Sequence, residues 1–302
     1  MEQQPLSSSH EAYFNAFQAF VSKSAWWETV KKYSCEAVAH IMQKLTVNAV
    51  NSQVFRILGV GSGNGKLDIE ILKAVTTSLR ASDKAKKALI HACIVEPSSF
   101  LIADFKKAVS PLPECVANVA DVSFEWQETD FEDFITNSSP HESNHYHMAH
   151  FIGCLYYMDA EQSLNNGLKL LANGGALLCL VAGDNSYFAK QSLKFQDKLK
   201  CLPAVSKFYT GKDLVAIAER NNWKYEEFPL VQYEVDITSC FDRSSPTGRL
   251  LLNFLTHEVD FQGSTDPMLY KEVMEFLTES SISDSNGRKL LTSELAIVVL
   301  YK

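Results

Sequence analysis

A run of alternate glycines is the segment of this 302-residue chain whose spacing first suggests chemistry. Gly59 and Gly61 end the apolar run Val54–Val60, and Gly63 and Gly65 lead into a segment with helical spacing. Glycine lets a backbone turn sharply after a strand and approach a bound molecule closely, because no Cβ stands in the way. The segment could also be a plain glycine-rich turn, so alone it is a weak signal.

The spacing of these glycines distinguishes between cofactors. A dinucleotide fingerprint G-x-G-x-x-G that starts at Gly61 needs a third glycine where Lys66 stands. One that starts at Gly59 finds Asn64 in its third place. The G-x-G-x-G that is present suits the carboxypropyl arm and adenosine of S-adenosylmethionine better than a pyrophosphate. The pattern therefore disfavours an NAD-linked oxidoreductase.

Two acidic residues follow the next predicted strands. Glu96 ends the apolar run Ala88–Val95, beside the glycine loop in a parallel sheet, where a carboxylate can accept hydrogen bonds from both ribose hydroxyls. An acid at a strand end is often simply solvated, and Glu96 lies further from the loop than the roughly 20 residues typical of this motif. Asp130 is a candidate for the adenine end, but it is equally suited to cap the next helix.

Four histidines, at 141, 145, 147 and 150, could suggest a metal site. With the period of a strand, 145 and 147 share one face and 150 lies opposite. No carboxylate or cysteine stands at ligand spacing from them, so we predict no metal site. No His–Asp arrangement in the sequence identifies itself as a general base either.

Apolar runs alternate with segments of helical spacing, which predicts an α/β fold with a doubly wound parallel sheet. We expect a helical cap at 1–50, a Rossmann-like cofactor-binding core at 51–185, and substrate-domain inserts with returning strands at 186–302. The cap and inserts are expected to cover the carboxyl ends of the strands, where ligands bind in such sheets. The core strands are predicted at Val54–Val60, Ala88–Val95, Val122–Thr129, His145–Ile152 and Ala176–Val181.

Composition excludes some classes of partner and compartment. With 28 basic and 36 acidic residues and no basic stripe, the chain is not expected to bind nucleic acid. Its seven scattered cysteines form no C-x-x-C pair, which is typical of free thiols in a reducing compartment. No signal-peptide pattern and no apolar run of membrane-spanning length occur. We therefore expect a cytoplasmic protein without membrane contact.

From His150 to Tyr157 the sequence resembles the vertebrate histamine N-methyltransferases and their relatives that methylate carnosine. The resemblance runs nearly end to end. It implies a Rossmann-like class I methyltransferase with a mostly parallel seven-stranded sheet and an added helical substrate cap. A monomer that moves a methyl group from S-adenosylmethionine to an imidazole nitrogen of a small molecule is expected. The most specific segments are Tyr13…Phe17…Phe20, Ile57–Asp68, Ile94–Ser98, His150–Tyr157, Asp236–Phe241 and Leu251–Thr256.

The resemblance also assigns residues. Gly61, Glu96 and Ile152 look like cofactor contacts, to which the glycine pattern adds Gly63 and Gly65. The aromatic side chains that line a substrate pocket would be those of Tyr13, Phe17, Phe20, Tyr156, Tyr157 and Phe254. Core packing is the alternative for a single phenylalanine of this set. Adjacent Tyr156 and Tyr157 cannot both point into the core from a strand end.

Several positions depart from the family pattern. Trp26, Gly153 and Ser293 stand where the histamine enzymes have an acid, an amide and an asparagine that read histamine's polar atoms, although Glu28 lies two residues from the first. Leu101 replaces a cofactor-contacting glutamine, and Gln191 a pocket tryptophan. These changes indicate an acceptor that differs from histamine or is larger, with carnosine-like dipeptides as the best candidate.

The implied chemistry is an in-line displacement on a neutral nitrogen lone pair. A free imidazole, with a pKa near roughly 6.5, is mostly uncharged at neutral pH and needs no general base. We therefore assign no catalytic residue and expect proximity and alignment to accelerate the reaction. The alternatives are a methyltransferase for a different small amine and a binding or regulatory protein that keeps the fold without catalysis.

Overall fold

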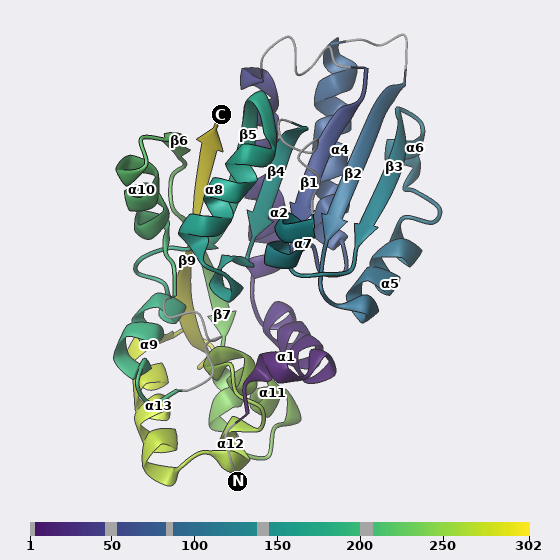
Figure 1. Cartoon of the computed structure of the whole chain (residues 1–302). Helices are drawn as coiled ribbons and strands as arrows, with labels where there is room; N and C mark the ends of the chain where they lie inside the picture. The colour runs from purple at the N-terminus through teal and green to yellow at the C-terminus, as the bar shows by residue number, and fades with distance from the viewer. Residues whose placement is uncertain (1–3, 46–52, 83–86, 138–144, 200–207) are drawn as a thin grey trace. The chain divides into compact units, whose positions relative to one another are not determined.

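The computed structural model describes residues 4–45, 53–82, 87–137, 145–199 and 208–302 (Figure 1). These residues divide into two compact units. Unit 1 consists of Met1–Val30, Ala182–Thr210 and Leu230–Ala296, and unit 2 of Lys31–Val181, Gly211–Pro229 and Ile297–Lys302.

Unit 2 is built on five parallel strands in the order β3-β2-β1-β4-β5. The chain starts in the middle at β1, moves outward to β3, and then returns to β4 on the other side of β1. This reversal confirms the predicted doubly wound α/β fold, in which ligands bind at the carboxyl ends of the strands next to the switch point. The strands are β1 (Phe55–Val60), β2 (Ala88–Val95), β3 (Ala120–Gln127), β4 (Tyr146–Ile152) and β5 (Leu171–Ala182).

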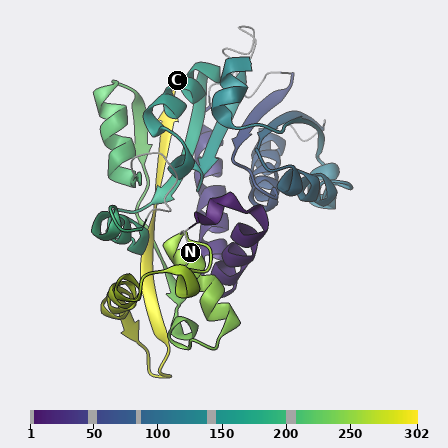
Figure 2. The same cartoon turned by 60° about the horizontal axis from the view of Figure 1, so that its bottom comes forward.

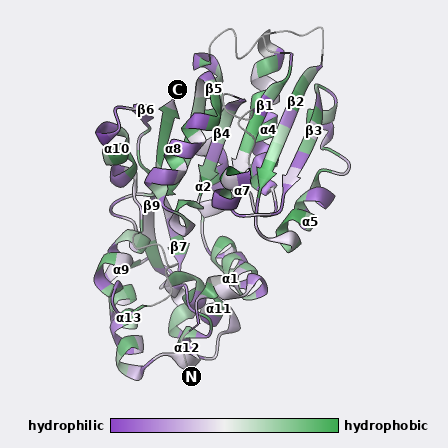
Figure 3. Ribbon diagram, in the orientation of Figure 1, coloured by the Kyte–Doolittle hydropathy of each residue, from purple (hydrophilic) through white to green (hydrophobic). Residues whose placement is uncertain are grey.

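Helices cover both faces of these strands. Right-handed crossovers require α4 and α5 on one face and α7 and α8 on the other, and Figure 1 shows α8 in front of β4 and β5 with α4 behind β1. The central strands are buried almost throughout and mainly hydrophobic in Figure 3. The helices of unit 2 are α4 (Lys66–Ser82), α5 (Ser99–Ala108), α6 (Glu114–Ala117), α7 (Phe131–Asn137), α8 (Ala160–Leu170), α10 (Gly211–Arg220) and most of α2 (Trp26–Lys44), with the short turn η3 (Leu155–Tyr157).

The other four strands of the sheet form antiparallel pairs with one another. The long strand β9 (Lys289–Tyr301) pairs at its end with β6 (Lys224–Glu227) in unit 2. Its first half pairs in unit 1 with β7 (Val231–Asp236) and the short β8 (Ser281–Ser283). Across the described residues the sheet thus has nine strands, and the expectation of seven is wrong.

The extra strands have local causes. β6 and β7 are separated by a segment that contains Pro229, which has no N–H to donate to a neighbouring strand. Residues 281–283 turn back from the preceding helix as β8, and the turn between β8 and β9 is closed by Asp284.

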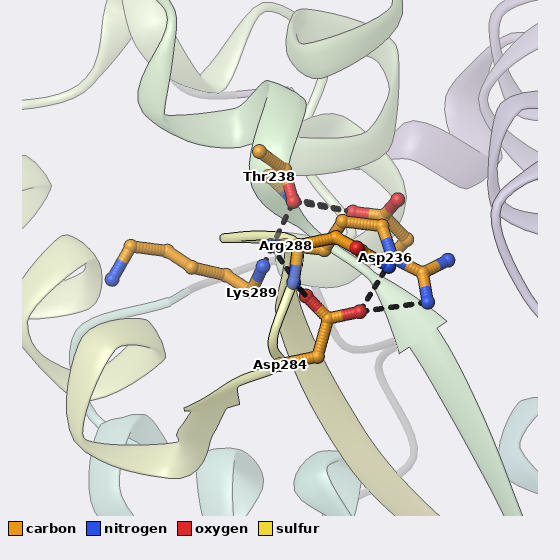
Figure 4. Close-up of polar contacts among 6 residues, drawn as sticks. Asp236, Thr238, Asp284, Arg288 and Lys289 are labelled. Carbon is orange, nitrogen blue, oxygen red and sulfur yellow. Dashed lines mark hydrogen bonds and ion pairs between the residues drawn. The ribbon is translucent and has the colours of Figure 1, made fainter.

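Figure 4 shows how this hairpin is attached within unit 1. Asp284 accepts hydrogen bonds from the backbone N–H and the Nε of Arg288, both at 2.8 Å. Thr238, in η4 (Thr238–Phe241), donates its hydroxyl to Asp236 at 2.6 Å and accepts the N–H of Lys289 at 2.9 Å. The end of β7 is therefore joined to the start of β9 by side chains as well as by the strand ladder.

The remaining helices belong to unit 1. α1 and α11 lie side by side, as both Figure 1 and Figure 2 show. Ser9 begins α1 by accepting the N–H of Ala12 on its hydroxyl, which satisfies a free donor of the first turn. No described helix is long and apolar enough to cross a membrane. The bounds are η1 (Leu6–Ser8), α1 (His10–Ser22), α9 (Tyr187–Phe195), α11 (Pro246–Thr256), α12 (Phe261–Ser264) and α13 (Pro267–Ser280).

Candidate functional site

The glycine loop lies at the carboxyl end of β1, in a conformation that requires glycine. Gly61, Gly63 and Gly65 have φ angles of +65°, +57° and +73°, which side chains rarely adopt. A Cβ on Gly61 would stand 2.5 Å from the Cβ of Cys154, and one on Gly65 would stand 2.0 Å from the ring of Phe105. The loop therefore packs closely on the next elements, and only its middle glycine faces open space.

Glu96 joins this loop to the end of β2. Its side chain is only 6% exposed. One carboxylate oxygen accepts the N–H of Gly63 at 2.9 Å, and the other accepts the N–H of Ser98 at 2.9 Å. Because each carboxylate oxygen has two lone pairs, Glu96 can accept further hydrogen bonds from a ligand's hydroxyls. The buried carboxylate is thus held at the switch point by two backbone donors.

The other predicted cofactor residues follow the same edge of the sheet. Ile152 is the last residue of β4, which pairs directly with β1, and it is half-buried. Leu101 lies in the first turn of α5 and donates its N–H to the hydroxyl of Ser98 at 3.3 Å. Asp130 follows β3 and accepts the N–H of Asp133 at 2.8 Å, the capping arrangement weighed above as its alternative.

A buried contact between a histidine and an aspartate lies under the glycine loop, and no motif in the sequence indicates it. Nε2 of His150 in β4 lies 3.2 Å from Oδ1 of Asp68 in α4, and these side chains are 4% and 6% exposed. The hydroxyl of Ser62, in the glycine loop, donates to the same Asp68 oxygen at 2.8 Å. Gly59 leaves the space for this cluster, since a Cβ there would lie 2.6 Å from the Ser62 hydroxyl and 2.7 Å from Asp68.

The other histidines have structural surroundings. Nδ1 of His147 accepts the N–H of Arg56 at 2.9 Å, and its ring stacks on Phe55. Burial lowers the pKa of His147 to about 4, so the ring is neutral at physiological pH. His141 lies outside the described residues. Within the described ranges no group of three or more His, Cys, Asp or Glu side chains could hold a metal ion.

Unit 1 contains a cluster of aromatic rings, which we call the aromatic wall. Tyr13, Phe17 and Phe20 follow one another along α1, with ring centres 6.2 and 6.4 Å apart. Phe254 of α11 stacks on Phe20 at 4.5 Å and lies 5.6 Å from Phe17. Trp26 meets Phe17 edge-on at 5.3 Å. The structure thus brings five of the predicted acceptor residues together.

The remaining predicted acceptor residues lie elsewhere. Gly153 follows β4 at φ +67°, and no atom lies within 4 Å of where its Cβ would be. Tyr156 and Tyr157 form the turn η3, half-buried and 36% exposed respectively. Ser293 is buried in β9 opposite Tyr233. Glu28 is exposed in the first turn of α2, and Trp26, at the start of the same helix, contacts Phe17.

The residues around the glycine loop and the residues of the aromatic wall could bind different chemical groups. The glycine loop with Glu96 offers backbone donors and a carboxylate to a nucleoside with free hydroxyls. The aromatic wall offers π faces, which attract a sulfonium or ammonium group by about 0.5–2 kcal/mol, depending on how far the site excludes water.

Relatives of known activity match the chain over nearly its whole length. It is 27% identical to carnosine N-methyltransferase 2 of Gallus gallus, covering 97% of this chain and 87% of that protein. It is 25% identical to histamine N-methyltransferase of Danio rerio, covering 98% and 97%. The bovine histamine N-methyltransferase is 26% identical, with the same coverage. No protein-family model matches the chain.

Solved structures share the fold. Loganic acid methyltransferase, solved with SAH, superposes with a TM-score of 0.53 at 13% identity, covering 91% of this chain and 93% of that one. The YcgJ protein of Bacillus subtilis gives a TM-score of 0.51 at 12% identity, covering 88% and 98%. Together with the glycine loop and Glu96, these likenesses identify the chain as an S-adenosylmethionine-dependent methyltransferase related to the histamine and carnosine N-methyltransferases.

Proposed function

We propose that the chain methylates an imidazole nitrogen of a small histamine- or carnosine-like compound, and that carnosine-like dipeptides are better acceptors than histamine. The observation that carries this proposal is the composition of the aromatic wall. Trp26 contributes a ring beside Phe17, and the nearest carboxylate in sequence, Glu28, is exposed. Such a wall suits a flat imidazole better than it suits an ion pair with a primary ammonium group.

For the methyl donor we propose contacts with Gly61, Gly63, Gly65, Glu96 and Ile152. Glu96 would accept the ribose hydroxyls, as its burial and its bond to the loop suggest. Leu101 is proposed as a further contact with the methyl donor, and Asp130 as a contact at the adenine end. Asp130 follows β3, and its Oδ1 already accepts the N–H of Asp133. Its other carboxylate oxygen would therefore be the one that contacts the ligand.

For the acceptor we propose contacts with two groups of residues. The first group is the aromatic wall, namely Tyr13, Phe17, Phe20, Phe254 and Trp26, to which Ser293 and Glu28 are added from the resemblance. The second group, Gly153, Tyr156 and Tyr157, directly follows the proposed donor contact Ile152 along the chain. Gly153 has open space at its Cβ position, which suits an acceptor larger than histamine.

The proposed reaction needs little from protein side chains. S-adenosylmethionine supplies an electrophilic methyl group whose bond to sulfur breaks as the bond to nitrogen forms. The acceptor's neutral imidazole provides the lone pair, and the resulting imidazolium product needs no proton removed by the enzyme. The residues proposed to bind the donor and the acceptor would therefore act by aligning the methyl group with the nitrogen. Alignment of this kind can lower the activation barrier by roughly 7–11 kcal/mol.

A panel assay with labelled methyl donor tests the proposal. Carnosine, histidine, histamine and simple primary amines are offered under steady-state conditions, and the methylated nitrogen is assigned by NMR. We expect transfer to an imidazole nitrogen, with kcat/KM for carnosine above that for histamine. Transfer only to aliphatic amines, or a kcat/KM for histamine equal to or above that of every dipeptide, would refute the proposal.

We also propose that the enzyme acts as a monomer in the cytoplasm. The buried Cys154, Cys179 and Cys240 are free thiols, as a reducing compartment allows. Light scattering coupled to size-exclusion chromatography tests the first point, and fluorescence localisation of the tagged chain tests the second.

A further inference from the structure

Unit 1 contains a hollow that the proposed function does not yet use. About 280 Å³ of space, part of it open to solvent, lies between the residues that line it. Its described lining includes no Lys, Arg, Asp or Glu. The main lining residues are Phe188, Gln191, Phe195, Leu199, Phe208 and His257.

Gln191 is the unusual member of this lining. The residue is 4% exposed, and its Nε2 has no hydrogen-bond partner among the described residues. A buried amide donor without an acceptor is unfavourable, and a ligand that supplies an oxygen there removes that cost. One turn earlier on the same helix, the buried hydroxyl of Tyr187 also lacks a partner in the described chain.

The other polar groups of the lining do not compete for this donor. Thr256 uses its hydroxyl within α11, where it donates to the carbonyl of Leu252 at 2.8 Å. Burial lowers the pKa of His257 to about 4, so its imidazole is uncharged at physiological pH. The hollow is therefore electrically neutral, and a neutral oxygen acceptor enters it at less desolvation cost than a carboxylate.

The hollow adjoins the aromatic wall through shared rings. Phe188 lies 6.1 Å from Phe20 and 6.0 Å from Phe254, and it also lines the hollow. His257 lies 5.9 Å from both Phe188 and Phe254. A molecule with its imidazole ring on the wall could thus extend its tail into the hollow.

We infer that the hollow binds the tail of the methyl acceptor and that Gln191 donates a hydrogen bond to an amide carbonyl of that tail. The inference rests on the proposed function, which places an imidazole on the aromatic wall. It names the acceptor class more closely: imidazoles whose side chain continues through an amide, as in a dipeptide or an acylated imidazole amine.

The test compares two neutral acceptors that differ in the amide alone. N-acetylhistamine has the carbonyl, and a 4-alkylimidazole of the same length lacks it. The ratio of their kcat/KM values is measured for the wild-type enzyme, for Gln191→Leu and for Gln196→Leu. Gln196 ends the same helix but is exposed and does not line the hollow, so it is the matched control.

We expect the wild type and Gln196→Leu to prefer N-acetylhistamine, and Gln191→Leu to lose roughly 5- to 150-fold of that preference, the usual effect of leaving one buried group unpaired. Gln191→Glu, whose carboxylate accepts instead of donating, should shift the preference toward ammonium-bearing histamine. An unchanged ratio in a folded Gln191→Leu protein would overturn the inference, as would a wild-type preference for the alkylimidazole.

Failure of the proposed function gives a different result. If the wild type methylates no imidazole, calorimetric binding of the same two compounds still tests the hollow. Tighter binding of N-acetylhistamine that is lost in Gln191→Leu would then support the role of Gln191 while the reaction is reassigned. Equal binding of both compounds by all three proteins would refute the role of Gln191 as well.

Discussion

Replacing Glu96 by Gln changes one oxygen to an NH2 group at the point where β1 and β2 end. In the native protein both oxygens accept backbone N–H groups at 2.9 Å, one from Gly63 and one from Ser98. A glutamine side chain has a single oxygen, so in either orientation its NH2 group faces one of these donors. One N–H is left without an acceptor, which costs about 1–3 kcal/mol of the free energy of unfolding.

The same substitution should weaken binding of S-adenosylmethionine. A hydrogen bond to a charged group contributes about 1.5–3 kcal/mol, which corresponds to a Kd raised roughly 10- to 150-fold. Isothermal calorimetry measures the Kd, and urea denaturation of the unliganded protein measures the stability loss separately. Glu227→Gln is the control, because Glu227 also ends a strand but is exposed. An unchanged Kd in a folded Glu96→Gln protein would remove Glu96 from the donor site.

Three further predictions concern pH and packing. The log of kcat/KM should rise with pH and level off just above the pKa of the acceptor imidazole. If acceptors with different pKa values all give a plateau that begins at the same pH, the enzyme itself supplies a base. Gly59→Ala should destabilise the protein by about 1–3 kcal/mol in urea denaturation, since its methyl group overlaps Ser62 and Asp68; an unchanged midpoint would show that the cluster can move aside. The folded pKa of His147, about 4, lies below the ordinary 6.5, so only the unfolded chain takes up this proton as pH falls between these values and stability declines there. His147→Asn should flatten that decline in pH-dependent denaturation, and an equally steep curve would contradict the assignment.

The arrangement of the core was predictable because its signals are local. Apolar runs that are followed directly by Gly61 and Glu96 mark strand ends, and parallel pairing brings such ends to one edge. The strand count was not predictable in the same way. β8 has three residues and little apolar character, and only its pairing with β9 makes it a strand.

The Asp68–His150 pair could not be found from sequence, since it depends on register. His150 stands beside Gly59 because β4 pairs with β1, and Asp68 reaches both from the first turn of α4. The period of a strand places His150 and His147 on opposite faces of the sheet. It does not show which side chain of another element contacts His150. Similarly, nothing in the sequence around Gln191 indicates that its amide lacks a partner.

Trp26 connects the fold of the first loop to the choice of acceptor. The N–H of Ala25 donates to the carbonyl of Glu234 in β7, so the start of α2 is fixed within unit 1. With that start fixed, Trp26 meets Phe17 and Phe20, while Glu28, two residues on, is exposed. A ring there attracts an ammonium group by about 0.5–2 kcal/mol, whereas a buried charge-assisted hydrogen bond would contribute about 1.5–3 kcal/mol. The position of Trp26 thus reduces the binding energy available to an acceptor that ends in an ammonium group. An acceptor whose tail carries an oxygen can instead accept a hydrogen bond from Gln191, whose Nε2 otherwise has no partner among the described residues.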